Sequence, residues 1–246
     1  MRVGYRTDVG RARPINEDAL WADGRLLVLA DGMGGHQAGE VASRMAVELV
    51  VARLNGSCGA LDSEPDPEAA ERVRASLCEA NEAVYAKALQ DPGLRGMGTT
   101  LTVALLAGGE AVIGHVGDSR AYLVRPEAIV QLTEDHSVVW ELVKSGGLTR
   151  DQAQVHPYRN LLTRALGTSP EVEVDTLRLR LQPEDGLLLC SDGLTSVLAD
   201  AEIHDIIKRS KDPQTAVDRL IDEANARGAP DNVSAILAMP EAADCA

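Results

Sequence analysis

The sequence predicts an α+β fold in which two antiparallel β-sheets pack as a β-sandwich and helices flank both outer faces, giving four α-β-β-α layers. The order of the elements supports this prediction: strands, two helices, more strands, then helices and a final strand. A parallel sheet would instead alternate strand and helix regularly. Apolar residues make up 45% of the chain, enough for a sizeable core. No Pro/Gly/Ser-rich linker divides the sequence, so we expect a single domain over residues 1–246.

The first third of the chain is expected to form a strand pair and then two helices. The segments are residues 19–21, 26–30, 39–54 and 66–89. Asp23-Gly24 between the two strands is typical of a hairpin turn. Asp66-Pro67 is a favourable helix start, because Asp can accept hydrogen bonds from free helix N–H groups and Pro suits the first turn.

From residue 99 onward, short β-prone runs separated by Gly or Pro dominate, and helical spacing returns near residue 136. The expected strands are residues 99–106, 111–115, 120–124, 129–132, 172–181, 187–191 and 233–239, and the expected helices are residues 136–145, 201–209 and 215–227. Thr133 or Asp135 is expected to cap the first of these helices. The polar stretch 146–159 is expected to be irregular.

The charge balance excludes some classes of partner. The formal net charge is −14 and the pI is about 4.8, which argues against a nucleic-acid groove or an anionic membrane surface. No apolar run approaches the ~20 residues needed to span a bilayer, and the N-terminal residues contain no apolar signal segment. The four Cys residues form no CxxC pair and are expected to be reduced thiols. These features predict a cytoplasmic protein.

Two apolar strands that each run into Asp-Gly are the strongest chemical signal. Residues 26–30 lead into Asp31, residues 187–191 lead into Asp192, and Asp231 stands just before the last strand. Carboxylates gathered at close range need a cation between them, and their hard oxygens suit Mg²⁺ or Mn²⁺. Two such ions ~3.5–4 Å apart can form a hydrolytic site. Taken alone, each Asp-Gly is also compatible with a simple turn.

Further charged residues strengthen the metal hypothesis. Arg13, Glu17 and Asp18 lie on the segment that leads to Asp31, and Asp118 lies between two β-prone runs. A guanidinium group can hold a phosphate through two parallel hydrogen bonds. The alternatives are that Arg13 is a surface charge and that Asp118 forms a turn.

The ordered set of these motifs resembles the metal-dependent (PPM, or type 2C) protein serine/threonine phosphatases, in the compact form of the bacterial members. The resemblance extends from Arg13 to Leu237. The motifs are Arg13 with Asn16-Glu17-Asp18, Asp31-Gly32-Met33-Gly34-Gly35-His36, Gly98-Thr99-Thr100, Gly117-Asp118-Ser119-Arg120, Ser191-Asp192-Gly193 and Asp231-Asn232.

The resemblance implies two core metal ions, Mn²⁺ or Mg²⁺, and a weaker third ion. Asp31 would bridge the two core ions, and Gly32 would add its backbone carbonyl, which no side chain obstructs. Asp192 and Asp231 would complete the first ion. By the same resemblance, Gly193 would be only a turn residue.

The remaining roles are also implied by the resemblance. Glu17 and Asp18 would surround the second ion, partly through water, and Asp118 would share the third ion with Asp192. Arg13 would hold the substrate phosphate. His36 would protonate the leaving alkoxide as a general acid, a form of catalysis that contributes ~10²–10⁴-fold. A structural role for His36 is the alternative.

The function expected from this reading is hydrolysis of phosphoserine and phosphothreonine in proteins by direct attack of a metal-activated water. Residues 146–164 resemble the flap of the bacterial members, a segment beside the site that would govern access. The expected partners are phosphorylated proteins, targets of a cognate bacterial serine/threonine kinase, and the protein is expected to be a monomer. Three alternatives remain: a phosphoprotein-binding module of the same fold with weak or no catalysis, a small-molecule phosphoesterase, and a structural domain that binds Ca²⁺.

Overall fold

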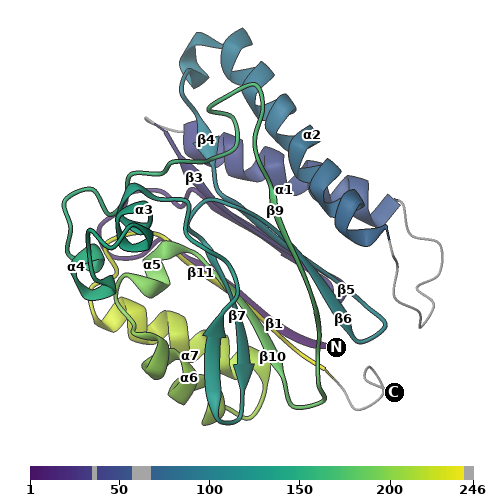
Figure 1. The fold of residues 1–246 in the computed structure, drawn as a ribbon, viewed down its shortest axis with the longest axis vertical. Coiled ribbons are helices and arrows are strands. Elements are labelled where there is room, and N and C mark those ends of the chain that lie inside the picture. Colours follow the sequence, from purple (N-terminus) through teal and green to yellow (C-terminus); the bar gives the residue numbers. More distant parts are fainter. Residues whose placement is uncertain (35–37, 57–67, 241–246) are drawn as a thin grey trace.

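Two antiparallel β-sheets pack face to face, and a helical layer covers the outer face of each (Figure 1). The computed structural model describes residues 1–34, 38–56 and 68–240. All strand pairs in these residues are antiparallel. The predicted four-layer α+β sandwich is therefore confirmed.

The first sheet has the order β2-β3-β5-β6-β9, with the short strand β4 paired to β3. Its strands are β2 (Asp18–Ala22), β3 (Leu26–Met33), β4 (Gly98–Thr99), β5 (Leu101–Ala107), β6 (Glu110–Val116) and β9 (Asp175–Arg180). The predicted hairpin is present, since Ala22 pairs with Leu27 next to Asp23-Gly24. This sheet carries the first Asp-Gly pair within β3.

The second sheet has the order β1-β11-β10-β7-β8. Its strands are β1 (Arg2–Asp8), β7 (Arg120–Arg125), β8 (Ala128–Gln131), β10 (Gly186–Cys190) and β11 (Val233–Met239). The chain crosses between the sheets at the turn from β6 to β7. This sheet carries the second Asp-Gly pair, directly after β10.

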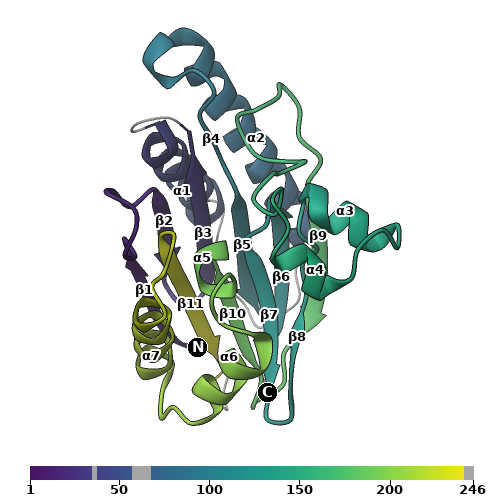
Figure 2. The same ribbon diagram turned by 90° about the vertical axis from the view of Figure 1, so that its left-hand side faces the viewer.

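Helices cover the two outer faces and also form a separate unit at one end of the sandwich (Figures 1 and 2). They are α1 (Ala38–Gly56), α2 (Ala69–Gln90), the 3₁₀ turn η1 (Pro92–Leu94), α3 (Val138–Lys144), α4 (Arg150–Gln154), α5 (Asp192–Thr195), α6 (Asp200–Lys208) and α7 (Pro213–Ala226). Helices α1 and α2 pack on the first sheet, and α6 and α7 pack on the second. Figure 2 shows α3 and α4 standing to one side of both sheets.

Three apolar clusters fill the interfaces between the layers. One lies between α1, α2 and the first sheet, and another lies between α6, α7 and the second sheet. The third lies between the sheets and includes Leu27, Leu29, Leu187 and Leu189. Leu, Val, Ile and Ala dominate all three clusters, because the chain has no Phe and only 2% aromatic residues.

Three elements differ from the expectation. β1 contains three charged residues and Tyr5, and its only buried residue is Gly4, so an apolar pattern is missing. Helix α4 lies inside the stretch expected to be irregular, and a reciprocal cap between Thr149 and Gln152 stabilises its first turn. Helix α5 is a single turn that begins at Asp192.

The cap of α3 also corrects the expectation. Ser137 accepts a hydrogen bond from the Trp140 backbone N–H at 3.3 Å, so Ser137 is the N-cap. Asp135 instead binds the Arg120 guanidinium, and the Thr133 hydroxyl accepts from the Ala121 N–H.

Two further sequence features concern membranes and thiols. Across the described ranges, every helix is too short or too polar to cross a bilayer. Cys78 and Cys190 are free thiols. Burial raises the pKa of the Cys190 thiol to about 12, as befits a core residue of β10 and not a nucleophile. The Asp66-Pro67 helix start lies outside the described residues.

Candidate functional site

The predicted carboxylates meet where the two sheets converge at one end of the sandwich. Asp18 and Asp31 are direct partners across the β2–β3 pair. Asp192 follows β10, and Asp231 lies two residues before β11. Asp118 lies in the turn between β6 and β7, where the chain passes from one sheet to the other. Elements from both sheets therefore deliver carboxylates to one region.

Asp18 joins the two sheets through serine hydroxyls. Its Oδ2 accepts hydrogen bonds from Ser191 Oγ at 3.0 Å and from Ser234 Oγ at 2.6 Å. Ser191 Oγ also accepts from the Ser234 backbone N–H at 2.9 Å. The two serines thus hold one oxygen of Asp18 and leave the other free for a different partner.

The backbone of Asp31 is held by the Gly98-Thr99-Thr100 motif. Its carbonyl accepts from the Thr100 N–H at 2.9 Å and from Thr99 Oγ1 at 2.9 Å, and its N–H donates to Thr100 Oγ1 at 3.0 Å. Thr100 Oγ1 is also 2.8 Å from Ser119 Oγ, beside Asp118. The motif therefore fixes Asp31 relative to the β6–β7 turn.

The two glycines after the strand ends are required by close backbone contacts. A Cβ on Gly32 would lie 2.2 Å from the Gly39 carbonyl oxygen and 2.6 Å from the Glu17 carbonyl oxygen. A Cβ on Gly193 would lie 2.0 Å from the Asn232 carbonyl oxygen. Gly193 is thus more than a turn residue, because it lets α5 approach the segment that carries Asp231.

Asn232 fastens the N-terminal loop to the site. Its Oδ1 accepts from the Glu17 N–H at 2.8 Å, and its Nδ2 donates to the carbonyls of Val9 and Ile15, each at 2.9 Å. This loop carries Arg13, whose Nη2 lies 2.7 Å from Asp231 Oδ2. The Arg13 side chain is 46% exposed, so it can also reach a ligand from solvent.

The cluster is electrostatically strained. Burial and the neighbouring Asp18 carboxylate raise the pKa of Asp31 well above its usual range, and burial with Asp192 does the same for the pKa of Asp118. The pKa of Asp192 is raised by burial and by Asp231, and a hydrogen bond with Asp31 opposes part of that rise. Like charges in a desolvated space account for all of these shifts.

Uncompensated oxygens give a direct test of whether a cation fits. Glu17 Oε1, Asp18 Oδ1 and Asp192 Oδ1 are buried and have no hydrogen-bond partner among the described residues. A buried carboxylate oxygen without a donor is costly, and a hard cation satisfies it. The donor set consists only of oxygen atoms, so Mg²⁺ or Mn²⁺ fits its chemistry.

The carboxylates do not yet form a closed coordination shell. Among the described residues, three His, Cys, Asp or Glu side chains nowhere converge tightly enough to enclose an ion. The carboxylates influence one another's charge but are held by other partners. Arg13 holds Asp231, and two serines hold Asp18. Small side-chain rotations would be needed to bring these oxygens onto an ion.

His36, the expected general acid, lies outside the described residues. Sequence reasoning missed Ser234, because a single serine within an apolar strand carries no distinctive pattern. It included Ser191 in the Ser191-Asp192-Gly193 motif but assigned no contacts to it. It assigned no contacts to Asn232, although the Asp231-Asn232 motif drew attention to that position.

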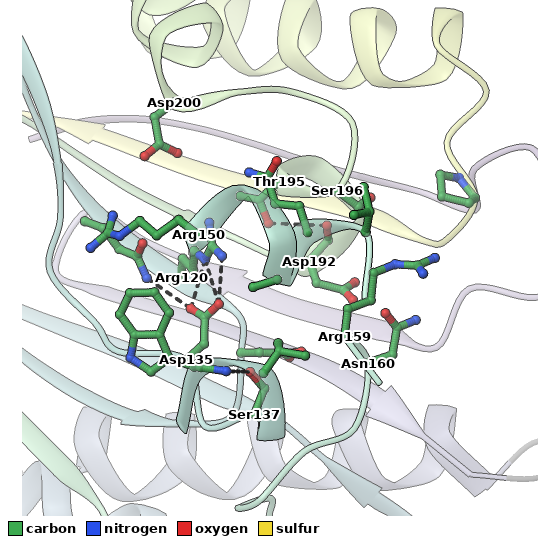
Figure 3. Close-up of a pocket in the computed structure, with 18 residues that line it drawn as sticks. Arg120, Asp135, Ser137, Arg150, Arg159, Asn160, Asp192, Thr195, Ser196 and Asp200 are labelled. Carbon is green, nitrogen blue, oxygen red and sulfur yellow. Dashed lines mark hydrogen bonds and ion pairs between the residues drawn. The ribbon is translucent and has the colours of Figure 1, made fainter. Parts of the chain in front are cut away.

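A cavity of about 570 Å³ opens beside the carboxylates (Figure 3). Asp118 and Asp192 line one side of it, and residues of α3, α4 and the following segment line the other side. Figure 3 shows Arg120 directed at Asp135, which also accepts a hydrogen bond from Gln131 Nε2 at 3.0 Å. The cavity connects the carboxylate cluster to the region expected to act as a flap.

Comparison with known proteins identifies the family. The model of the family described as protein phosphatase 2C matches residues 13–238. The serine/threonine phosphatase stp of Listeria welshimeri is 41% identical over 242 residues, which cover 96% of this chain and 95% of that protein. The crystal structure of the Mycobacterium tuberculosis serine/threonine phosphatase PstP/Ppp is similar at a TM-score of 0.89 with 40% identity, and 98% of each chain is covered.

A second solved structure has metal in the corresponding fold. It is the catalytic domain of PstP in complex with two manganese ions, with a TM-score of 0.86, 38% identity and 96% of each chain covered. The match of the family model and the identity to these relatives extend over nearly the whole sequence. The chain belongs to the protein phosphatase 2C family.

Proposed function

We propose that this protein is a Mn²⁺- or Mg²⁺-dependent phosphatase that hydrolyses phosphoserine and phosphothreonine in proteins. The observation that carries the proposal is the buried carboxylate cluster with uncompensated oxygens beside Arg13. Membership of the protein phosphatase 2C family and the manganese-bound PstP domain support it.

The residues proposed to hold the two core ions come from both sheets. Asp31 with the Gly32 carbonyl would serve both ions, Asp192 and Asp231 would serve the first, and Glu17 and Asp18 would serve the second. When bound, such ions supply a hydroxide nucleophile near neutral pH and neutralise the negative charge that develops on the phosphoryl group.

We also propose Asp118, with Asp192, as the site of a weaker third ion. Asp118 is held in the β6–β7 turn, and the neighbouring Ser119 is tied to Thr100. Asp118 and Asp192 both line the cavity.

Arg13 is proposed to bind the substrate phosphate. In the structure it is paired with Asp231, which is itself a proposed metal ligand. Metal and phosphate would each replace one partner of this ion pair, so both charges stay compensated when the site is loaded. His36 is proposed to donate the proton that the departing serine or threonine oxygen needs.

The proposal also covers the partners of the protein, its location in the cell, its oligomeric state and its domain organisation. Phosphorylated proteins are the proposed substrates, in line with the names of the Listeria and Mycobacterium relatives. A cognate serine/threonine kinase, a cytoplasmic location, a monomeric state and a single domain with a flap near residues 146–164 are proposed with it. Light scattering of the purified protein tests the monomeric state.

The proposed function is tested by hydrolysis of a phosphothreonine peptide with Mn²⁺, with EDTA and with Mg²⁺. We expect phosphate release with either ion and none with EDTA. Glu184→Gln, an exposed carboxylate-to-amide change at the opposite end of β10 from Asp192, serves as the control for Asp31→Asn. Activity that persists in EDTA would contradict the metal mechanism, and peptide binding without hydrolysis under any divalent ion would favour the binding-module alternative.

A further inference from the structure

One wall of the cavity beside the carboxylates consists of residues that have no role in the proposed hydrolysis. Its lining continues from Asp192 to α3 and α4 and includes Trp140, Arg150, Val155 and Arg159. These residues touch none of the proposed metal ligands in any recorded hydrogen bond or ion pair of the described chain. At about 570 Å³, the cavity has room for several side chains of a bound polypeptide beyond the phosphoryl group.

The acidic residues that line the cavity are already engaged. Asp135 is bound by Arg120 through contacts of 2.7 to 3.2 Å, and Asp200 Oδ1 accepts from Tyr122 Oη at 3.0 Å. Asp118 and Asp192 belong to the carboxylate cluster. Asp135 and Asp200 are therefore already paired within the protein, and the proposed metal ions would compensate Asp118 and Asp192.

Two arginines of the lining, unlike Asp135 and Asp200, have side chains without an ion-pair partner among the described residues. Neither Arg150 nor Arg159 makes a recorded ion pair or side-chain hydrogen bond within the described residues, and both are exposed. The Arg150 guanidinium lies over the Trp140 ring, 5.0 Å from its centroid, and this cation–π contact gives the arginine a defined direction. In a chain of net charge −14, two unpaired cations beside the site form a local anion-binding surface.

Exposed apolar side chains lie on the same segment as Arg159, and one of them, Val155, lines the cavity. Val155 is 79% exposed, Tyr158 is 60% exposed and Leu161 is 53% exposed, all on the segment that follows α4. Exposed apolar side chains gathered beside a cavity are typical of a binding surface. Cations and apolar groups together match an extended peptide that carries acidic and apolar side chains.

We propose that this wall binds the polypeptide that flanks the phosphorylated residue, and that Arg150 and Arg159 select flanks with Asp or Glu side chains. The inference rests on the proposed function, because it assigns a preference to the same site. The cavity is continuous with Asp118 and Asp192, so a peptide whose phosphate reaches the cluster passes these arginines. Charge complementarity here favours encounter with acidic segments and disfavours basic ones.

The test compares two phosphothreonine peptides that differ only in having Glu or Gln at three positions on each side of the phosphothreonine. With Mn²⁺ present, we expect kcat/KM of the wild-type protein to be about five- to tenfold higher for the Glu peptide, and the ratio to fall at high salt because exposed charges are screened. The Arg150→Ala/Arg159→Ala variant is expected to reduce the ratio to about one- to twofold.

Two further variants separate charge from structure. Arg150→Lys/Arg159→Lys keeps both charges and is expected to keep most of the Glu preference. Arg180→Ala removes an exposed cation at the far end of β9 and is expected to leave the ratio unchanged. A wild-type ratio near one, or an unchanged ratio in the double Ala variant, overturns the inference while the phosphatase function stands. Failure of the wild-type protein to hydrolyse either peptide overturns the proposed function itself.

Discussion

Two buried groups of titratable side chains lie on either side of the β6–β7 turn, and their polar atoms are satisfied to different degrees. On one side, His115 and His136 pack with ring centroids 4.8 Å apart. On the other side lie the carboxylates around Asp31. The histidine pair has all of its partners within the protein, whereas the carboxylate cluster keeps buried oxygens that no described residue pairs with.

Each ring nitrogen of the histidine pair has a partner, which also fixes the tautomers. His115 Nε2 donates to the Glu134 carbonyl at 3.1 Å, so its Nδ1 accepts from Thr102 Oγ1 at 2.9 Å. His136 Nδ1 accepts from the Gly117 N–H at 3.0 Å, so its Nε2 donates to Asp175 at 3.1 Å. Both rings are therefore neutral, and burial lowers the pKa of each.

The comparison teaches how to distinguish structural from functional burial of polar groups. A buried polar network whose atoms all have hydrogen-bond partners stabilises the fold. A network with unpaired atoms destabilises the fold until a ligand binds those atoms. The carboxylate cluster should therefore cost stability in metal-free protein, and the histidine pair should support the fold at neutral pH.

The largest effect is expected from Asp31→Asn. Removal of the central charge should lower kcat/KM for a phosphothreonine peptide by about 10³-fold, because the proposed bridging ligand is lost. The same change should raise the melting temperature of the metal-free protein, because repulsion among carboxylates is relieved.

Calorimetric melting of both proteins with and without Mn²⁺ checks this prediction. Wild-type protein should gain about 2.7 kcal/mol at a Mn²⁺ concentration 100 times its Kd, and Asp31→Asn should gain much less. A metal-free Asp31→Asn protein that melts below wild type would contradict the interpretation of the cluster as strained.

Arg13→Ala should reduce kcat/KM by about 10²-fold, because a charge-assisted contact to the phosphate is lost. Arg11→Ala is the matched control, since Arg11 is exposed on the same loop and, among the described residues, only its backbone makes a hydrogen bond. Equal effects of the two substitutions would show that Arg13 acts through the general charge of the loop.

The pH dependence of stability should distinguish the two groups, because their contributions have opposite signs. Burial lowers the pKa of His115 from 6.5 to about 4. Between these two pH values the imidazole binds a proton in the unfolded state but not in the folded state. The His115 contribution to stability is therefore complete above about pH 6.5 and should fall by about 2 kcal/mol between pH 7.5 and pH 5. The raised pKa values of the carboxylates act the other way and favour the fold as the pH falls.

Urea unfolding of wild type and His115→Gln at both pH values isolates the histidine contribution. The variant should lose less stability on acidification than wild type. The same acid-induced loss in both proteins would assign the effect to other groups.

Thr102→Val should have the smallest effect. It removes the hydroxyl that donates to His115 Nδ1 and should lower the free energy of unfolding by about 1 kcal/mol. Peptide hydrolysis should stay within about twofold of wild type, since the histidine pair supports the fold rather than the chemistry. Parallel urea and activity measurements check both expectations.

The strongly patterned parts of the fold could be predicted from the sequence. β11 has the predicted bounds because its apolar run is continuous and begins directly after Asp231-Asn232. β1 could not be predicted, since an edge strand with one buried residue needs no apolar pattern. Helix α4 was not predicted, because its signal in the sequence is a local cap, which is weaker than a periodic apolar pattern.

The candidate site likewise has a part that could be predicted from the sequence and a part that could not. The ordered motifs point to the carboxylates and to Arg13, and the structure brings these residues to one end of the sandwich. The hydroxyl contacts of Asp18 and the pairing of Arg13 with Asp231 depend on the meeting of segments more than 170 residues apart, since the pairs are separated by 173, 216 and 218 positions. No local pattern encodes such contacts.

The position of β11 between β1 and β10 has a consequence for biosynthesis. β11 follows every other described strand and helix along the chain, yet it is the sole described strand that pairs with β1, and it supplies Ser234 to Asp18. A nascent chain that has emerged only as far as α7 therefore has most of the carboxylates but cannot join them. Dephosphorylating activity should appear only when the last strand is released, so truncated translation products should be inert.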